Sequence, residues 1–308
     1  MVNAKGLRFI PADTPAFQDI TVGEWAYRGC PNPSTWKYGL GKHFLLGSSY
    51  VFPNGDMTPV GGKCIKNVTG YDFTRFLTGA YSDLAIGVQY IIKLMPLPAF
   101  RYRYDLSFQS LGALAQFIGE LQNCPVSPAY LFWADEKAGR KLFGNQQSGH
   151  RVLMELDGNE IEVRDIVKSI NKILNRVKIE GDAVVLPNMS YLEDREDGLW
   201  IMDEFKIHYS VIDKFEQYFK KTLKQFGIEG GLFGYPADGK VHLYFEKRHP
   251  ETKKILTALE EGSKELGGIR TGKFVRLYDG IAEGPLGALE NSFRKVKDPQ
   301  LIFNQIGK

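Results

Sequence analysis

Segments with the side-chain period of a β-strand alternate with segments that have the period of a helix, and this alternation constrains the fold most strongly. From Phe100 to Phe108, apolar and polar side chains alternate at every second position, as in a half-buried strand. Ser110 follows as a typical helix N-cap. The apolar face of the expected helix comprises Leu111, Leu114, Phe117, Ile118 and Leu121.

The alternation repeats twice more along the chain. A strand at 151–156 precedes a helix with an apolar stripe that ends near Val177. A strand at 206–212 precedes a helix with apolar positions from Phe215 to Phe226. Two further strands are expected at 231–235 and 241–245. Single helices between strands, followed by strand pairs, are typical of ferredoxin-like β-α-β units, so we expect residues 99–308 to form one antiparallel sheet backed by helices.

Residues 1–98 have a different character, with many glycine, proline and aromatic residues between short apolar runs. Asn54-Gly55 lies between two extended runs and predicts a hairpin with a type I′ turn. A short helix is expected from Val68 to Thr78 and a strand from Leu84 to Met95. Prolines at 96 and 98 end that strand, so we expect one domain at 1–98 and a second at 99–308, with the C-terminal end of the second returning to the first.

Composition excludes several classes of protein. The 308 residues are 43% hydrophobic and 24% charged, and 39 basic against 36 acidic residues leave a net charge of only +3, which argues against nucleic-acid binding. No apolar run reaches the length of a membrane span, and the first residues do not resemble a secretion signal. The three cysteines are far apart, without a CxxC pair. We expect a cytoplasmic protein, with peripheral membrane attachment through partners left open.

One stretch, from Lys37 to Pro98, carries a series of short motifs. In chain order they are Tyr38-Gly39, Leu46-Gly47, Pro53-Asn54-Gly55, Gly61-Gly62-Lys63, Lys66-Asn67-Val68, Gly70-Tyr71-Asp72, Gly79, Leu84 and Lys93-Leu94. This stretch resembles the second half of the FAD-binding domain in FAD-linked oxidases of the glycolate oxidase and D-lactate dehydrogenase type. Thr21-Val22-Gly23 looks like the start of the family's TxGG loop, and Asp298-Pro299 with the final Gly307-Lys308 looks like its DP…NPGK terminus.

The resemblance implies an α+β fold, in which the second subdomain of a PCMH/VAO-type FAD-binding domain is joined to a ferredoxin-like cap domain. It also implies FAD as the cofactor. Glycine lets main-chain N–H groups approach a flavin or its pyrophosphate closely, although each glycine can also serve a turn. The cofactor-binding residues expected on this basis are Gly23, Gly61, Gly62, Lys66, Asn67, Gly70, Tyr71, Asp72 and Gly79. For Asp72, capping of the following helix is an equal alternative.

The sequence departs from the family pattern in two places around the expected flavin. Proteins of this family begin with about a hundred further residues, the size of half a domain, whose glycine loop cradles the FAD pyrophosphate. We therefore expect FAD to be shared with a partner chain. In addition, Glu24, Ser82 and Ala85 stand where the family has glycine, so they add side chains and, at Glu24, a negative charge.

The expected cap domain also departs from the family. The motif HxGDGNxH, whose histidines hold a metal in related dehydrogenases, corresponds here to Tyr235 through His242, and the first histidine is replaced by Tyr235. We expect no metal site. If a flavin is present, His242 is the best base for a hydroxyl proton and Arg270 the best cation for a substrate carboxylate. A solvated histidine and an ordinary surface arginine are the alternatives.

Two functions therefore remain open. The first is an FAD-dependent oxidoreductase subunit that acts on a small 2-hydroxy acid of the glycolate or lactate type, with a second flavoprotein subunit and an iron–sulfur subunit as the expected partners. The second is a non-catalytic, degenerate paralogue that acts as a structural or regulatory subunit of a flavoprotein complex.

Overall fold

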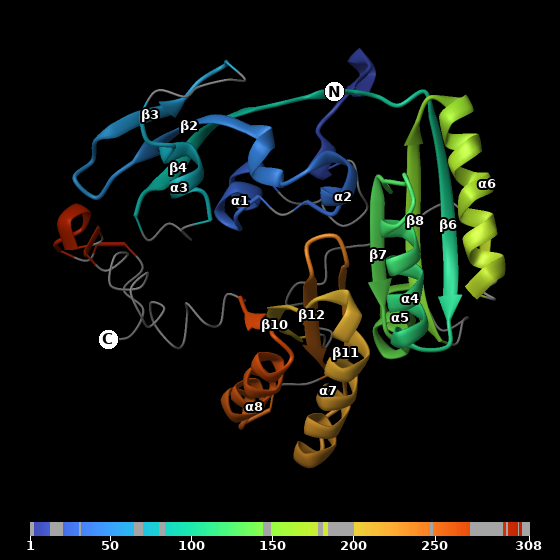
Figure 1. Ribbon diagram of the computed structural model, residues 1–308. Helices are drawn as coiled ribbons and strands as arrows, with labels where there is room; N and C mark the ends of the chain where they lie inside the picture. The colour runs from blue at the N-terminus through green and yellow to red at the C-terminus, as the bar shows by residue number, and fades with distance from the viewer. Residues whose placement is uncertain are drawn as a thin grey trace. The chain divides into compact units, whose positions relative to one another are not determined.

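Two compact units make up the chain in the computed structural model (Figure 1). Residues 1–32, 38–97 and 274–308 form the first, called here the hairpin unit, and residues 33–37 and 98–273 form the second, the sheet unit. The structure describes residues 3–12, 21–30, 32–64, 70–79, 84–143, 149–177, 181–183, 200–246, 249–271, 292–293, 295–300 and 302–303.

The sheet unit is built on one eight-stranded sheet. Its strands are β6 (Phe100–Phe108), β7 (Tyr130–Ala134), β8 (His150–Gly158), β9 (Gly181–Ala183), β10 (Trp200–Lys206), β11 (Gly230–Tyr235), β12 (Lys240–Phe245) and β13 (Ile269–Arg270). Across the sheet they lie in the order β13-β10-β12-β11-β7-β8-β6-β9, and every printed pairing is antiparallel.

That order contains two copies of one arrangement. The first half of the sheet unit contributes β6, β7, β8 and β9, which lie side by side in the order β9-β6-β8-β7. The second half contributes β10, β11, β12 and β13, which lie in the order β13-β10-β12-β11. In both halves the fourth strand of the chain is therefore followed by the first, the third and the second. This is the ferredoxin-like β-α-β-β-α-β arrangement. The two halves join where β11 pairs with β7, at Phe233 opposite Ala134 and Gly234 opposite Trp133. The expectation of one antiparallel sheet made of repeated ferredoxin-like units is confirmed.

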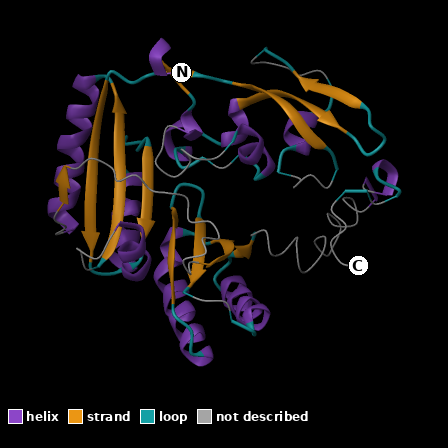
Figure 2. Cartoon of the chain, turned by 180° about the vertical axis from the view of Figure 1, so that it is seen from behind, coloured by secondary structure: helices purple, strands orange, loops and turns teal. Residues whose placement is uncertain are grey.

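Four helices share the apolar core of this sheet: α4 (Leu111–Gln122), α6 (Glu160–Val177), α7 (Ile212–Phe226) and α8 (Thr252–Glu265), shown from behind in Figure 2. A further helix, α5 (Glu136–Phe143), follows β7. The Ser110 hydroxyl caps α4 by accepting the N–H of Ala113, as expected. Leu106, Phe215 and Leu243, from both halves, are all fully buried in one continuous core.

The hairpin unit contains a three-stranded sheet, in the order β3-β2-β4, and a strand pair, β1 with β5. The strands are β1 (Leu7–Arg8), β2 (Leu45–Val51), β3 (Met57–Gly61), β4 (Ile86–Ile92) and β5 (Met95–Pro96). The remaining helices are α1 (Val22–Tyr27), α2 (Thr35–Tyr38), α3 (Phe73–Leu77) and the 3-10 helices Asn3–Lys5, Ile10–Ala12 and Gly41–Phe44, while Tyr209–Val211 is a 3-10 helix of the sheet unit.

The hairpin of β2 and β3 forms where Asn54-Gly55 predicts it, but its turn is of another type. Gly55 has φ +85°, whereas Asn54 is not among the described non-glycine residues with positive φ. The N–H of Gly55 donates to Phe52, and the N–H of Phe52 donates to Asp56. A type I turn followed by a left-handed glycine is the usual geometry of a three-residue hairpin loop, so the expected type I′ turn is wrong.

Other boundaries also differ from those expected. The strand expected at 206–212 is wrong because β10 ends at Lys206, and His208 instead caps the 3-10 helix that follows. Helix α3 begins only at Phe73, after Asp72. Strand β7 is buried on both faces, so its apolar residues do not alternate with polar ones, and the sequence analysis missed it.

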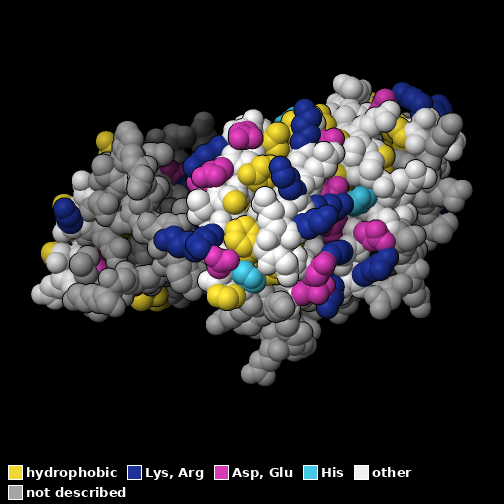
Figure 3. Space-filling view, turned by 90° about the horizontal axis from the view of Figure 1, so that it is seen from below, with side chains coloured by type: hydrophobic (Ala, Val, Ile, Leu, Met, Phe, Trp, Pro, Cys, Tyr) yellow, Lys and Arg dark blue, Asp and Glu magenta, His cyan; other side chains and the backbone are white. Residues whose placement is uncertain are grey.

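The described surface is mixed in charge. On the face seen in Figure 3, basic and acidic side chains are interspersed rather than gathered into fields of one sign. Among the described residues, no helix combines the length and the apolar character needed to cross a bilayer.

Candidate functional site

A pocket of about 320 Å³ lies in the hairpin unit between α1 and β4. Gly23 and Glu24 of α1 line it, together with Tyr50 of β2 and Gly87 and Tyr90 of β4. Helix α1 begins here because the Thr21 hydroxyl accepts the N–H of Glu24. Backbone exposed at glycine beside aromatic rings is a lining that suits a flat conjugated ligand.

The Glu24 carboxylate does not face this pocket as an isolated charge. The Arg28 guanidinium lies 2.7 Å from it, one helical turn away. An anion near this wall therefore meets a balanced ion pair rather than a bare carboxylate. Burial raises the pKa of the Tyr90 phenol, so this ring is a neutral part of the wall at physiological pH.

Two of the expected cofactor glycines are required by the protein's own backbone. A Cβ at Gly61 would lie 2.4 Å from the Leu46 carbonyl oxygen, and Gly61 also has φ +69°. A Cβ at Gly79, where φ is +78°, would lie 2.7 Å from the Cα of Gly29. These close approaches account for both glycines without any ligand.

Three other glycines are not explained by such contacts. A Cβ at Gly62 or Gly70 would meet no atom of the described residues within 4 Å, and one at Gly23 would meet none closer than 3.8 Å. Gly70 has φ +79°, which favours glycine by itself. Gly62 has neither a positive φ nor a neighbour within 4 Å among the described residues, so its backbone is open to approach by a ligand.

The turn before α3 is open rather than packed into the interior. Gly70 and Asp72 are exposed, and the Tyr71 side chain is 89% exposed. Asp72 caps α3 because its carboxylate accepts the N–H of Arg75 at 3.0 Å. Lys66 and Asn67 lie outside the described residues.

The pocket lining is compatible with one wall of a flavin site, and of the described residues expected to bind the cofactor only Gly23 belongs to that lining. The pocket volume is near the lower limit of small-molecule sites, so the described wall suits the ring system better than a whole dinucleotide. Gly23 lines the pocket, and Gly62 and Gly70 are open positions at which backbone could approach a cofactor. Chemically, such a wall can hold and orient a flavin but contributes no acid or base.

A cluster of titratable groups lies on the sheet unit, on β10 and β12. His242 lies directly opposite Glu204 in the strand register, and its Nε2 is 3.9 Å from Glu204 Oε2. The same oxygen pairs with Lys240 Nζ at 3.3 Å, while Thr271 Oγ1 donates to Oε1 at 2.9 Å. Burial opposes ionisation of Glu204, but Lys240, His242 and Thr271 together hold its pKa below the ordinary value.

Aromatic rings surround the His242 imidazole on this face of the sheet. Its ring stacks on Phe233 with centroids 5.2 Å apart, and Tyr235 meets it edge-on at 6.2 Å. Phe132 of β7 continues the group and contacts both of those rings. The arrangement places an imidazole with a carboxylate partner in a largely apolar setting, which is suited to proton transfer.

The structure does not bring Arg270 and His242 together. Arg270 lies opposite Phe205, on the core face of the sheet, whereas His242 lies opposite Glu204 on the other face. The guanidinium donates to Asp203 at 2.6 Å and contacts Glu260 of α8 at 3.3 Å. Burial raises the pKa of Asp203 to about 6, against the lowering effect of Arg270.

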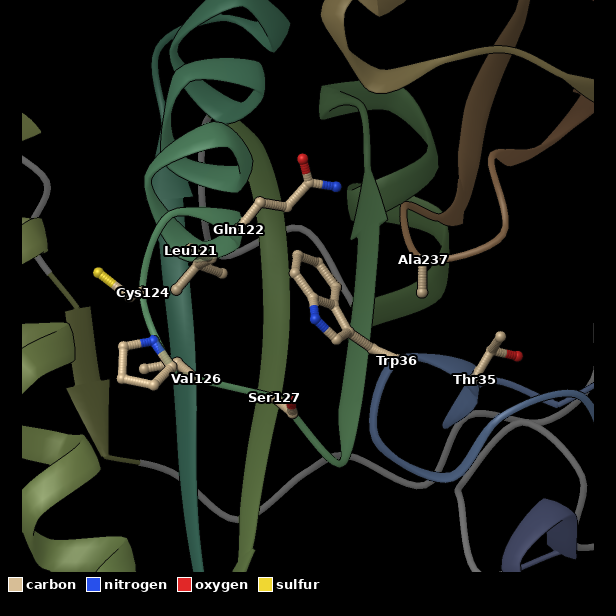
Figure 4. A pocket seen from close by; sticks show the side chains of 9 residues that line it. Thr35, Trp36, Leu121, Gln122, Cys124, Val126, Ser127 and Ala237 are labelled. Atoms are coloured by element: carbon tan, nitrogen blue, oxygen red, sulfur yellow. The ribbon is translucent and has the colours of Figure 1, made fainter.

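A second cavity, of about 420 Å³, lies at the end of α4 in the sheet unit. Figure 4 shows the Trp36 side chain extending from α2 toward Leu121 and Gln122, with Cys124 and Ala237 at the sides. No charged side chain lines it. Its lining offers neither a base nor a cation for an acid substrate, so it is not the better catalytic candidate.

Glu204, Lys240 and Thr271 are the members of the cluster that sequence reasoning missed as site residues. Lys240 occupies the asparagine position of the HxGDGNxH motif. Glu204 is distant from His242 in the sequence, and only the pairing of β10 with β12 shows that they are neighbours. Within the described residues, no three histidine, cysteine or acidic side chains are placed to hold a metal ion.

Comparison with solved structures defines the class of fold. Alkyldihydroxyacetonephosphate synthase matches 97% of this chain and 61% of its own with a TM-score of 0.71 and 15% identity. The 4-ethylphenol oxidase of Gulosibacter chungangensis matches 96% of this chain and 71% of its own with a TM-score of 0.69 and 11% identity. The fold is therefore that of PCMH/VAO-type FAD-binding proteins, as the sequence resemblance implies.

Curated relatives narrow the class. The glycolate oxidase subunit GlcD of Bacillus subtilis is 25% identical over 96% of this chain and 66% of its own length. The D-lactate dehydrogenase of Archaeoglobus fulgidus is 23% identical over 97% and 71%. The glycolate oxidase subunit GlcE of Escherichia coli is 24% identical over 58% and 54%. No protein-family profile matches the chain.

In sequence this chain is similar to FAD-linked oxidases, among them glycolate oxidase subunits and D-lactate dehydrogenases. It spans about two thirds of the length of the curated relatives it matches, between 66% and 71% for the first two named above.

Proposed function

We propose that this chain is a subunit of an FAD-dependent oxidoreductase that oxidises a small 2-hydroxy acid of the glycolate or lactate type. The observation that carries the proposal is its relation to GlcD over 96% of the chain. The open glycine wall of the hairpin unit and the imidazole–carboxylate pair of the sheet unit support it, because such an oxidation needs a cofactor wall and a base.

A bound flavin would supply the acceptor for the hydride that leaves C2 of the substrate. The residues proposed to hold it are Gly23, Gly61, Gly62, Lys66, Asn67, Gly70, Tyr71, Asp72 and Gly79. Of these, Gly61 and Gly79 would act by fixing the backbone that forms the wall, since their close contacts are internal.

We propose His242 as the base that takes the hydroxyl proton as C2 becomes a carbonyl. Glu204 would stabilise the imidazolium that results, because its carboxylate is 3.9 Å from Nε2. Stacking on Phe233 fixes the plane of the ring. The product is the corresponding 2-oxo acid.

We further propose that a second flavoprotein subunit completes the FAD site. The relatives GlcD and GlcE are both named as subunits of glycolate oxidase, which supports an assembly of several chains. An iron–sulfur subunit stays a prediction. A non-catalytic paralogue remains the second candidate, since Glu24 and Ala85 line the pocket where the family pattern has glycine.

The test is to purify the full chain alone and with its co-expressed genomic neighbours, and to record flavin absorbance and its bleaching by anaerobic glycolate or D-lactate. We expect flavin in the complex, bleaching by one of these acids, and loss of bleaching with retained flavin in His242→Asn. Colourless protein in both preparations would favour the paralogue. Bound flavin that none of these acids reduces would refute the proposed substrate class.

A further inference from the structure

Lys240 and His242 present their side chains on the same face of β12, two residues apart. Alternate residues of a strand share a face and lie roughly 6.6–6.8 Å apart along it. In the register with β11 they lie opposite Tyr235 and Phe233, and in the register with β10 opposite Lys206 and Glu204. A small molecule could therefore span an ammonium and an imidazole at this separation, with one polar group at each end.

Glu204 connects the two side chains. Its Oε2 atom is 3.3 Å from Lys240 Nζ and 3.9 Å from His242 Nε2. Thr271 holds the other carboxylate oxygen at 2.9 Å, so the Glu204 side chain is fixed between them. The ammonium and the imidazole are thus ordered around one carboxylate, in a position set by three separate segments of chain.

The alternative cation, Arg270, is committed to an internal role. Its side chain is 5% exposed and pairs with Asp203, whose side chain is fully buried. Withdrawing a partner from such a buried pair costs more than a small anion gains from one charged hydrogen bond. The Lys240 side chain is 22% exposed and its distance to Glu204 is 3.3 Å, so Lys240 is the more accessible of the two cations and has the looser ion pair.

Lys240 also offsets the negative charge of two neighbouring carboxylates. Glu204 and Asp238 are the acidic groups beside it, and the N–H of Lys240 donates to the Asp238 carboxylate at 3.1 Å. Burial raises the pKa of Asp238 to about 6, with the Lys240 charge opposing that shift, so this carboxyl is largely ionised at neutral pH. Without the ammonium, an incoming carboxylate would face two acids close together.

We propose that Lys240 binds the carboxylate of the 2-hydroxy acid substrate and so places the C2 hydroxyl at His242. The inference rests on the proposed function and names a binding residue within it. It assigns to Lys240 the role that sequence reasoning gave to Arg270. It fits acids whose hydroxyl and carboxylate are on adjacent carbons, because the ammonium and the imidazole both lie beside the same oxygen of Glu204.

The experiment measures binding rather than turnover. Oxamate, an unreactive analogue of a 2-oxo acid, is titrated into the full chain in its co-expressed complex, and the dissociation constant is determined by calorimetry. The imidazole resonance of His242, assigned with His242→Asn, reports whether oxamate lies beside that ring. We expect Lys240→Met to weaken oxamate at least tenfold and Lys240→Arg by less than about threefold, since the charge is kept.

Lys206→Met is the matched control, because Lys206 lies directly opposite Lys240 and carries the same charge. We expect it to change oxamate affinity by less than about twofold. Equal weakening by both Met variants, unchanged affinity in Lys240→Met, or no oxamate binding to the unaltered protein would each overturn the proposal. Oxamate binding that depends on Lys240 in a complex whose flavin no 2-hydroxy acid reduces would support the binding role and refute the proposed oxidation.

Discussion

The two units differ in how their apolar cores are organised. Both contain glycines whose backbone contacts leave no room for a Cβ, such as Gly61 in the hairpin unit and Gly230 in the sheet unit, but in the hairpin unit the described apolar core is divided into small clusters. In the sheet unit, one continuous core extends through both ferredoxin-like halves. Close backbone contacts accept only glycine, whereas a core accepts many apolar residues of suitable volume. The continuous core of the sheet unit therefore leaves more freedom of sequence than the small clusters of the hairpin unit.

The sheet unit also buries charges, and its stability should depend on them most. Replacing Arg270 with Met leaves Asp203 buried without its cation, so we expect the free energy of unfolding to fall by about 3–5 kcal/mol. Denaturant unfolding monitored by circular dichroism measures the change. Lys206→Met, at an exposed lysine of the same sheet, is the control, with an expected loss below about 1 kcal/mol. Equal losses of unfolding free energy in the two variants would contradict the structural role of the Arg270–Asp203 pair.

Asp135 gives the sheet unit a pH dependence that the described hairpin unit does not share. Burial raises the pKa of this carboxyl to about 7, despite the N–H groups of Ala138 and Leu232 that favour ionisation. A folded-state pKa above the unfolded value means that stability is full below about pH 4 and falls as the pH rises through 7. We expect the wild type to lose roughly 2–4 kcal/mol relative to Asp135→Asn between pH 4 and 8.

Urea unfolding of both proteins across that pH range provides the measurement. Asn at this position cannot ionise, and its loss of one of the two accepted hydrogen bonds is an offset that does not vary with pH, so the pH-dependent part of the difference reports the titration. A difference between the two proteins that does not vary with pH would show that the carboxyl is ionised throughout, and that the two backbone donors outweigh its burial.

Substitutions at two neighbouring glycines test which backbone positions of the hairpin unit are needed for folding and which for the cofactor. A Cβ at Gly61 would meet backbone at 2.4 Å, and the residue has a left-handed φ. We therefore expect Gly61→Ala to lower the free energy of unfolding by about 2–4 kcal/mol. Gly62→Ala meets no described atom within 4 Å and should leave thermal stability unchanged. If Gly62 approaches a flavin, the same change lowers the flavin content of the purified complex. Unchanged flavin in a stable Gly62→Ala protein would remove Gly62 from the cofactor wall.

The sequence predicts much of the sheet unit because periodicity depends on burial. Strand β6 and helix α4 follow directly from alternation, helical spacing and the Ser110 cap. Strand β7 is buried on both faces and has no period to detect. The expected boundary of the two domains at residue 98 stays a prediction, although the compact units also change there.

The site was less predictable than the fold. His242 could be singled out from a motif, but its partner Glu204 is fixed by the register of two strands, which no local pattern encodes. Arg270 is of the residue type expected to bind a substrate carboxylate. Only its burial beside Asp203 shows that its role is internal. Glycines at 61 and 62 are equivalent in the sequence, and they differ only in what lies near each Cβ position.

The smallest expected effect separates two roles of Asp72. Its carboxylate accepts the N–H of Arg75 at the start of α3, so Asp72→Ala should cost about 1 kcal/mol. Asp72→Asn keeps the cap and loses only the exposed ion pair with Arg75, at 2.8 Å, so its stability should change by less than about 0.5 kcal/mol. Thermal unfolding measures both variants. Since the turn before α3 is open, a cofactor role would appear as flavin loss in Asp72→Asn at nearly unchanged stability, whereas a purely capping role leaves the flavin content of that variant at the wild-type level.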